Sequence, residues 1–186
     1  MDKFILEGID FLGKDTLAQN IQHKLGFHQV IHYTKPLVLK AYEVPFLIDA
    51  RREHASQEQY QRESFRTMFK LLNSDIRLIL NRAHLGECVY APLYRGYSGD
   101  YIFELEKRAN MGYNEDVRLI LLVETFGTNA IRDDGLSLGP LENRIREQDM
   151  FIDAFVRSII PNKRMIAVTN DVGYRDTQDI LDEALA

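Results

Sequence analysis

Short apolar runs alternate with longer amphipathic segments along the chain. Each run is rich in Ile, Leu or Val and ends at turn or polar residues, which is typical of buried β-strands. The runs cover residues 3–7, 29–33, 75–80, 118–123 and 164–168. Because helix-length segments separate them, the pattern predicts an α/β fold with five parallel strands.

The segments between these runs show helical spacing. Phe65, Met68, Phe69 and Leu72 follow one another at positions i, i+3, i+4 and i+7. This spacing places apolar side chains on one face of a helix, so we expect that face to pack into the core. Phe151, Phe155 and Ile159 are spaced to lie on one face of a second helix of the same kind.

Two segments do not fit this alternation. Residues 34–51 contain Pro36 and Pro45, and residues 125–140 contain three glycines. Long irregular stretches in a compact domain usually serve as lids or binding loops. We therefore expect both segments to contact ligands.

The composition limits the class of protein. A chain of 186 residues with 45% apolar content suits one compact domain over residues 1–186. No apolar run reaches the ~18 residues of a membrane span, and the N-terminus does not resemble a signal peptide. The single cysteine, Cys88, agrees with a reducing compartment, so we expect a cytoplasmic protein. The net charge of −5 argues against nucleic acid as the main partner, without excluding it.

The first apolar run leads into a loop with the spacing of a phosphate-binding motif. Gly8 and Gly13 bracket four residues, and Lys14 follows, as in G-x-x-x-x-G-K-[ST]. Such a loop turns backbone N–H groups towards a phosphate, and the following helix adds its positive end. We therefore expect Lys14 to reach the outer phosphates of a nucleotide such as ATP.

Asp15 stands where the motif has Ser or Thr. A carboxylate could bind Mg²⁺ directly in place of the usual hydroxyl, since Mg²⁺ prefers hard oxygen ligands. Alternatively, Asp15 only favours the start of the helix through its charge. The neighbouring Thr16 still offers a hydroxyl to a phosphate oxygen or to the helix cap.

Polar residues gather just after the third apolar run, where open α/β sheets bind ligands. We expect Arg82 to bind an anion. The other candidates for substrate contacts in "NRAHLGECVYAPLYRG" are His84, Glu87, Tyr90 and Arg95. Each has a structural alternative: a local hydrogen bond for His84 and Glu87, aromatic packing for Tyr90, and a solvated surface position for Arg95.

Arg66 is a further candidate, because it lies between core-facing residues of the predicted helix. An arginine at the edge of a buried face suits phosphate or base recognition. A structural ion pair is the alternative.

Three stretches together resemble one family. "EGIDFLGKDT", "NRAHLGECVY" and "RDDGLS" look like the thymidylate kinase-like branch of P-loop nucleoside and nucleotide kinases, especially the small forms of bacteriophages. The similarity spans about residues 3–168. It implies a three-layer fold with the five-stranded parallel sheet between helices, a host cytoplasm if the source is a phage, and a dimer as a common but open assembly state.

The resemblance also implies roles for particular residues. Asp10 matches the acid that approaches the 3′-hydroxyl of the acceptor deoxyribose, and Arg82 matches the arginine that contacts the acceptor phosphate. Lys35 lies in a region that faces the acceptor nucleotide. Residues 125–146 resemble the lid over the phosphates, where Arg132 and then Arg144 are the expected sources of positive charge.

Two further positions depart from the family pattern. Family members often have Asp before the arginine, whereas this chain has Asn81. Some have an arginine inside the loop, where this chain has Phe11. An ionised phosphate acceptor needs no general base, so a monophosphate kinase would tolerate the change at position 81.

The sequence therefore predicts an ATP-dependent, Mg²⁺-requiring kinase that converts a deoxynucleoside monophosphate into the diphosphate. One alternative is a kinase for a hydroxyl, either of a free deoxynucleoside or of a 5-hydroxymethylated pyrimidine, free or within phage DNA. That reaction would need a base, for which Asp10 or Glu87 is available. A second alternative is a nucleotide-binding module without turnover, suggested by Asp15 and Asn81 together.

Overall fold

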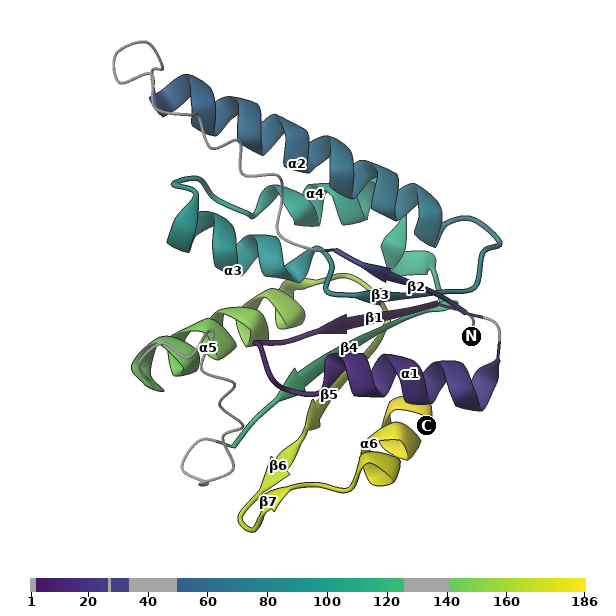
Figure 1. Cartoon of the computed structure of the whole chain (residues 1–186). Helices are drawn as coiled ribbons and strands as arrows, with labels where there is room; N and C mark the ends of the chain where they lie inside the picture. The colour runs from purple at the N-terminus through teal and green to yellow at the C-terminus, as the bar shows by residue number, and fades with distance from the viewer. Residues whose placement is uncertain (1–2, 27, 34–49, 126–140) are drawn as a thin grey trace.

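The computed structural model describes residues 3–26, 28–33, 50–125 and 141–186, with the side chains of 50–56 left out. Five parallel strands form one sheet in the order β2-β3-β1-β4-β5 (Figure 1). They are β1 (Lys3–Glu7), β2 (Gln29–His32), β3 (Leu78–Asn81), β4 (Val117–Val123) and β5 (Asn162–Ala167). The predicted α/β class and the five parallel strands are confirmed.

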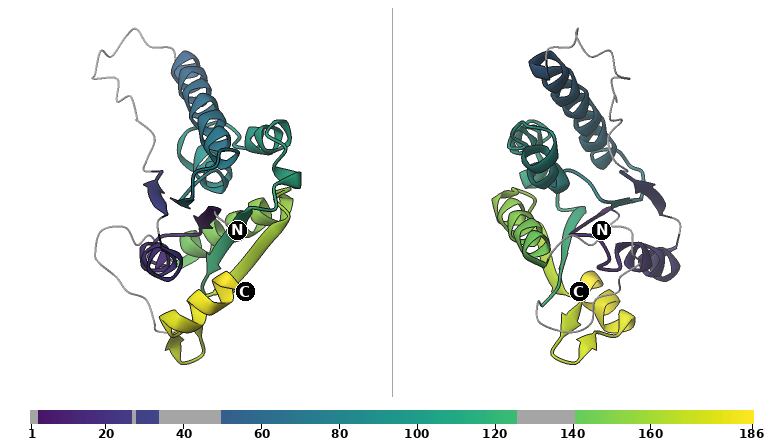
Figure 2. Two further views of the ribbon diagram at one scale, coloured as in Figure 1. Left: turned by 90° about the vertical axis from the view of Figure 1, so that its right-hand side faces the viewer. Right: turned by 60° about the vertical axis from the view of Figure 1, so that its left-hand side comes forward.

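Helices cover both faces of this sheet, which makes three layers. They are α1 (Lys14–Leu25), α2 (Ala50–Leu72), α3 (Leu85–Tyr94), α4 (Tyr101–Arg108), α5 (Leu141–Arg157) and α6 (Thr177–Leu185), with a 3₁₀ turn at Met111–Tyr113. Helices α1 and α6 lie together on one face, and α2 to α5 lie on the other (Figures 1 and 2). No helix within the described ranges is long and apolar enough to cross a membrane.

The strand boundaries differ from the predicted ones by a few residues. The predicted strand 75–80 begins only at Leu78, because the chain first turns after α2, where the Ser74 hydroxyl donates to the Leu71 carbonyl over 2.7 Å. A short hairpin of β6 (Thr169–Asn170) and β7 (Gly173–Tyr174) follows the sheet and was not predicted. Two-residue strands carry too short a pattern to be recognised in a sequence.

The predicted apolar stripes lie in the core. Phe65, Met68, Phe69 and Leu72 are at most 5% exposed, and they hold α2 against the sheet. Burial of aromatic and aliphatic side chains in this way contributes about 1.5–3 kcal/mol per residue to folding. The core therefore holds the sheet in place, and the polar loops extend from the ends of its strands.

The carboxyl ends of the inner strands meet at one edge of the sheet. Leu6 of β1 pairs in register with Asn81 of β3 and with Ile120 of β4, and Asn81 pairs with His32 of β2. The phosphate-type loop, which is residues 8–13, and the segment after β3 both leave the sheet at this edge. Residues far apart in the sequence thus lie within reach of one another there.

Candidate active site

The loop between β1 and α1 depends on its two glycines. Gly8 has φ of +134°, and a Cβ there would lie 2.5 Å from the carbonyl oxygen of Leu122. Gly13 takes the left-handed conformation at φ of 76° and precedes α1 without a side-chain cap. The first N–H groups of α1 therefore have no capping side chain, which is the usual setting for a bound phosphate.

Lys14 is buried at the start of α1, with 5% of its surface exposed. Its Nζ donates to the carbonyls of Gly8 over 2.9 Å and of Ile9 over 2.5 Å. Burial and the nearby Arg82 lower the pKa of Lys14 to about 8, although neighbouring carboxylates partly oppose this shift. Among the described residues its hydrogen bonds go to carbonyl oxygens alone, and a buried ammonium group of this kind is suited to an anion beside it.

Arg82 and Asp10 form a pair across the loop. Arg82 has φ of 64° directly after β3, and its backbone N–H donates to Leu6 over 2.9 Å. This turn directs Nη2 of Arg82 to Oδ1 of Asp10, at 2.5 Å. Both side chains are close to half exposed. The two residues expected at the acceptor therefore lie together, on the open side of the loop.

Asp15 lies in the first turn of α1 and contacts the ends of two strands. Its Oδ1 accepts from Nδ2 of Asn81 over 2.5 Å and is 3.6 Å from Nδ1 of His32. The Asp15 side chain is 76% exposed. Thr16, in the same turn, is also placed at the start of α1. The loop can thus offer a carboxylate oxygen and a hydroxyl to a nucleotide with its metal ion.

These residues fit Mg²⁺ together with a nucleotide better than Mg²⁺ alone. The described part of the chain holds no group of three or more His, Cys, Asp or Glu side chains that could bind a metal by themselves. Since Mg²⁺ usually keeps waters and takes one or two carboxylates plus substrate phosphates, a single Asp15 is sufficient for such a site.

Glu7 is a buried carboxylate beside this loop that sequence reasoning missed. It is 1% exposed, and its Oε1 accepts from the backbone N–H of Leu85 over 2.8 Å. Burial raises the pKa of Glu7, while His84, backbone N–H groups and Lys14 oppose the shift. The bond ties the end of β1 to the start of α3 and so helps to place Arg82. In the sequence, Glu7 could have been recognised as a candidate because it is an acidic residue at the end of the first apolar run.

His84 and Glu87 lie inside the protein. Nε2 of the fully buried His84 donates to Oε1 of Glu106 over 2.7 Å. Glu87 is 2% exposed and accepts from the hydroxyls of Tyr97 at 2.9 Å and Tyr101 at 2.8 Å. These contacts correspond to the local hydrogen bonds that the sequence left open as the alternative for both residues.

Arg95 joins the same buried cluster, since its Nη1 donates to Oε2 of Glu87. Arg66 lies on the outer face of α2, where it pairs with Glu63. The Arg66–Glu63 pair is the structural ion pair that the sequence left open as the alternative, whereas Arg95 does not take the solvated surface position. Arg95 is too well enclosed, and Arg66 points away from the core because its neighbours Phe65 and Met68 occupy that side.

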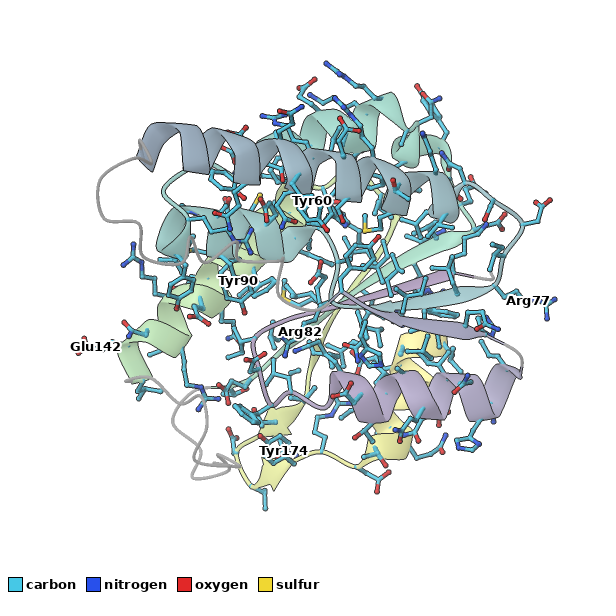
Figure 3. The ribbon with its side chains drawn as sticks, turned by 45° about the horizontal axis from the view of Figure 1, so that its top comes forward. Tyr60, Arg77, Arg82, Tyr90, Glu142 and Tyr174 are labelled. Atoms are coloured by element: carbon cyan, nitrogen blue, oxygen red, sulfur yellow. The ribbon has the colours of Figure 1, made fainter. Side chains whose placement is uncertain are left out.

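Tyr90 packs on aromatic rings. Its ring centroid lies 6.1 Å from that of Tyr94 and 5.8 Å from that of Phe151. Burial, followed by the carboxylate of Asp10, raises the pKa of Tyr90. Figure 3 labels Tyr90 and Arg82, which both lie on the segment after β3. Tyr90 thus shows the aromatic packing that the sequence left open as its alternative, and it lies within electrostatic reach of Asp10 and Arg82.

Arg144 connects α5 to the end of β4. Its Nη2 donates to Oε1 of Glu124, while its Nη1 has no hydrogen-bond partner among the described residues. Gln148 fixes the same point, because its side chain accepts from Glu124 N–H at 2.8 Å and donates to Glu124 C=O at 3.0 Å. Arg144 is thus held in place with one buried donor still unused. Lys35 and Arg132, the remaining candidates, lie outside the described residues, as does most of the expected lid.

Two surface cavities lie away from this loop. One, of about 480 Å³, is bordered mainly by α5 and includes Cys88 and Arg146. The other, of about 810 Å³, lies between α2 and α4 and includes Arg62 and Tyr101. Neither is lined by a residue of the phosphate-type loop, so the loop and its neighbours remain the candidate active site.

The chain matches no protein-family model and no curated protein. It is similar in structure to the YorR protein of Bacillus subtilis in complex with phosphorylated GDP, with a TM-score of 0.60 and 16% identity over 98% of this chain and 93% of that chain. It is also similar to the thymidylate kinase of Ehrlichia chaffeensis, with a TM-score of 0.59 and 18% identity over 98% and 96% of the two chains. For the thymidylate kinase of Candida albicans, the TM-score is 0.56 and the identity 12%, over 99% and 89%.

The protein has the α/β fold of the P-loop kinases, in which a five-stranded parallel sheet lies between helices.

Proposed function

We propose that the protein is an ATP-dependent, Mg²⁺-requiring kinase that phosphorylates a deoxynucleoside monophosphate, as thymidylate kinases do. One observation carries this proposal: the buried Lys14 at the uncapped start of α1 lies within electrostatic reach of the Arg82–Asp10 pair. Lys14 thus places one positive charge at the loop, and Arg82 places a second one on the open side of the loop. Two anions, a donor and an acceptor, can be held next to each other there.

The donor side consists of the loop and the groups around it. Gly8 and Gly13 allow the backbone to approach the phosphates, and Lys14 and the start of α1 supply positive charge. Asp15 and Thr16 would hold Mg²⁺ and a phosphate oxygen. Bound Mg²⁺ would supply charge neutralisation between the phosphates. Arg144 offers its unused donor, and Arg132 is proposed to add charge from the lid.

The acceptor side consists of the Arg82–Asp10 pair and Tyr90. Arg82 would bind the phosphate of the acceptor, and Asp10 would contact its sugar hydroxyl. Tyr90 lies within electrostatic reach of the pair and would contact the base. Because the acceptor oxygen of a monophosphate is already ionised, positioning and charge neutralisation are sufficient for transfer.

A hydroxyl acceptor is the second candidate, and Asp10 is the observation that favours it. Its carboxylate is partly exposed beside Arg82, where it could accept a proton from a hydroxyl of a deoxynucleoside or of a hydroxymethylated pyrimidine. Glu87 does not share this property, since three donors surround it inside the protein. The choice between the two candidates therefore depends on the acceptor.

A panel of acceptors separates these candidates. The protein is incubated with ATP and Mg²⁺ and with nucleosides, deoxynucleoside monophosphates or hydroxymethylated DNA, and the products are resolved by mass. A deoxynucleoside diphosphate supports the monophosphate kinase, whereas a phosphorylated nucleoside or DNA base supports the hydroxyl kinase. ATP binding by calorimetry without any product would instead indicate a binding module. The Lys14→Met variant serves as the inactive control.

A further inference from the structure

The turn that carries Arg82 has an unusual backbone conformation. Arg82 has φ of 64° directly after β3, and α3 begins only three residues later, at Leu85. A residue with a side chain rarely takes this left-handed conformation, and it persists only where the surrounding contacts fix it. The contacts around this short turn therefore decide where the Arg82 side chain points.

Strand β1 holds the backbone of the turn from the sheet side. The N–H of Arg82 donates to the carbonyl of Leu6 over 2.9 Å. The N–H of Leu85 donates to Oε1 of the buried Glu7 over 2.8 Å. These two bonds fix the first and the last residue of the turn.

The side chain of His84 holds the same turn from the helix layer. His84 is fully buried, and its Nε2 donates to Oε1 of Glu106 on α4 over 2.7 Å. Glu106, also fully buried, accepts from the hydroxyl of Ser158 over 2.7 Å and from the N–H of Ile159 over 2.9 Å, both just after α5. His84 also packs edge-on against Phe69 of α2, with 5.2 Å between ring centroids. The turn is thus connected to three helices through one side chain.

Stability alone does not account for this buried pair. Removing two polar groups from water is costly, and apolar residues of similar volume are often at least as stable in their place. In addition, Nδ1 of His84 is buried and has no hydrogen-bond partner in the described part of the chain, which adds to the cost. Such a pair directly behind a strained turn in the candidate active site indicates a role in that site.

We infer that His84, held by Glu106, is a positioning residue for the acceptor: it fixes the left-handed turn at Arg82 and so directs the guanidinium group towards Asp10. The inference rests on the proposed function, in which Arg82 binds the acceptor phosphate. Glu106 acts only through His84, and neither residue would touch the ligand. Such supporting contacts matter because a displacement of about 1 Å in a reacting site can cost ~100-fold in rate.

Three variants separate positioning from stability. The double variant His84→Phe/Glu106→Leu replaces the pair with apolar side chains, which removes the bond without leaving a buried charge. His84→Gln keeps an N–H donor close to the place of Nε2. Glu106→Gln keeps an acceptor for His84 but removes its charge, and so weakens the bond.

His28→Phe is the matched control. Like His84, His28 is buried, packs on a phenylalanine of the core (Phe4, 5.9 Å between ring centroids) and has a ring nitrogen without a partner among the residues that the structure describes. It precedes β2, however, and so lies at the amino edge of the sheet, opposite to the candidate active site. Its replacement tests the loss of a buried histidine as such.

Two measurements report on the turn and on the ligand. Amide hydrogen exchange by NMR shows how firmly the N–H groups of Arg82 and Leu85 are held, whatever the reaction is. Steady-state kinetics with ATP, Mg²⁺ and each of the four common deoxynucleoside monophosphates gives separate KM values for donor and acceptor. The melting temperature of each variant is measured on the same preparation.

The double variant should change the acceptor side selectively. We expect exchange at Arg82 and Leu85 to become at least ~10-fold faster and the acceptor KM to rise at least ~10-fold, while the KM for ATP changes less than ~3-fold. The melting temperature should stay within a few degrees of the wild type. Glu106→Gln should show the same selective change to a smaller extent, and it remains informative if the double variant does not fold. His84→Gln and His28→Phe should keep the acceptor KM within ~3-fold of the wild type.

Three results would overturn the inference. Wild-type exchange rates and acceptor KM in the double variant, or in Glu106→Gln if the double variant is unfolded, would show that the turn does not depend on the pair. An equal rise in both KM values, or an equally large change in His28→Phe, would indicate a general loss of order. A wild type that forms no product with any of the acceptors contradicts the proposed function, and the inference fails with it, whereas the first two results leave the proposed function intact.

Discussion

Arg82 donates a hydrogen bond to Asp10 over 2.5 Å, although 72 positions separate the two residues in the chain. The turn after β3 places Arg82 at φ of 64°, and the loop after β1 places Asp10 opposite. Both are partly exposed, so this pair contributes little to stability by itself. We propose that its position beside Lys14 serves to bind the acceptor.

Arg82→Lys should impair acceptor binding more than donor binding. Lysine keeps the charge and loses the planar fork that can contact Asp10 and a phosphate at once. We expect the KM for the acceptor to rise ~10- to 100-fold and the KM for ATP to change less than ~3-fold, as measured by steady-state kinetics. Arg157→Lys is the matched control, because Arg157 forms a comparably exposed pair with Asp100 at 2.6 Å. A rise in the KM for ATP alone would place Arg82 at the donor instead, and an equal rise in both KM values would contradict a selective acceptor role.

Lys14→Met should stabilise the nucleotide-free protein and abolish turnover. The pKa of Lys14, lowered to about 8, means that the charged form costs about 3 kcal/mol of folding free energy at pH 7. We expect the melting temperature to rise by at least ~3 °C and turnover to fall at least ~100-fold. Both are measured on the same preparation.

Lys163→Met is the control for that experiment. Lys163 also donates to carbonyls, those of Phe155, Val156 and Ser158, but at the end of α5. Burial lowers the pKa of Lys163 as well, so Lys163→Met should not lower the melting temperature, and it should leave turnover unchanged. A lower melting temperature in Lys14→Met would show that Lys14 is held mainly for stability.

Arg144 should have separable roles in stability and in turnover. Arg144→Met leaves Glu124 buried without its cation and should cost about 3 kcal/mol of stability by chemical denaturation. The double variant Arg144→Met/Glu124→Gln removes the unpaired charge and should recover most of that stability. Turnover should remain low in both, because the unused Nη1 donor is gone. Recovery of turnover in the double variant would reduce Arg144 to a structural residue.

Glu106→Gln should remove an acid-sensitive part of the stability. Burial disfavours the ionised form of Glu106, but bonds from His84, Ser158 and Ile159 outweigh it and hold the pKa below the ordinary value. An acid with a lowered pKa stabilises the fold above its unfolded pKa, and that contribution is lost as the pH falls through the folded pKa. The wild type should therefore exceed Glu106→Gln in melting temperature at pH 7, and the difference should shrink below about pH 4.5. A constant difference across this range would contradict the assignment.

Local patterns predicted the fold and the loop, because both depend on neighbouring residues. The five apolar runs specify strands through burial, and the stripe from Phe65 to Leu72 specifies a buried helix face. The spacing of Gly8, Gly13 and Lys14 describes one continuous turn, so its conformation follows from the sequence. The α/β class and the phosphate-type loop could therefore be predicted from the amino-acid sequence alone.

The partners of the charged residues could not be predicted in this way. Glu106 accepts from His84 across 22 positions, and Asn81 reaches Asp15 across 66. A charged residue could pair with many polar groups along the sequence, and the packing of the folded chain determines which of them it contacts. This is why Arg66, at a position that suggested a buried edge, pairs on the surface instead.

The sequence by itself thus determined the succession of strands and helices along the chain and the presence of a loop suited to a phosphate. The tertiary structure decided which side chains meet at the carboxyl edge of the sheet: Asp10 with Arg82, Asp15 with Asn81, and Glu124 with Arg144. The physical reason is that apolar periodicity acts over a few residues, whereas pairing of polar groups depends on strand order and register.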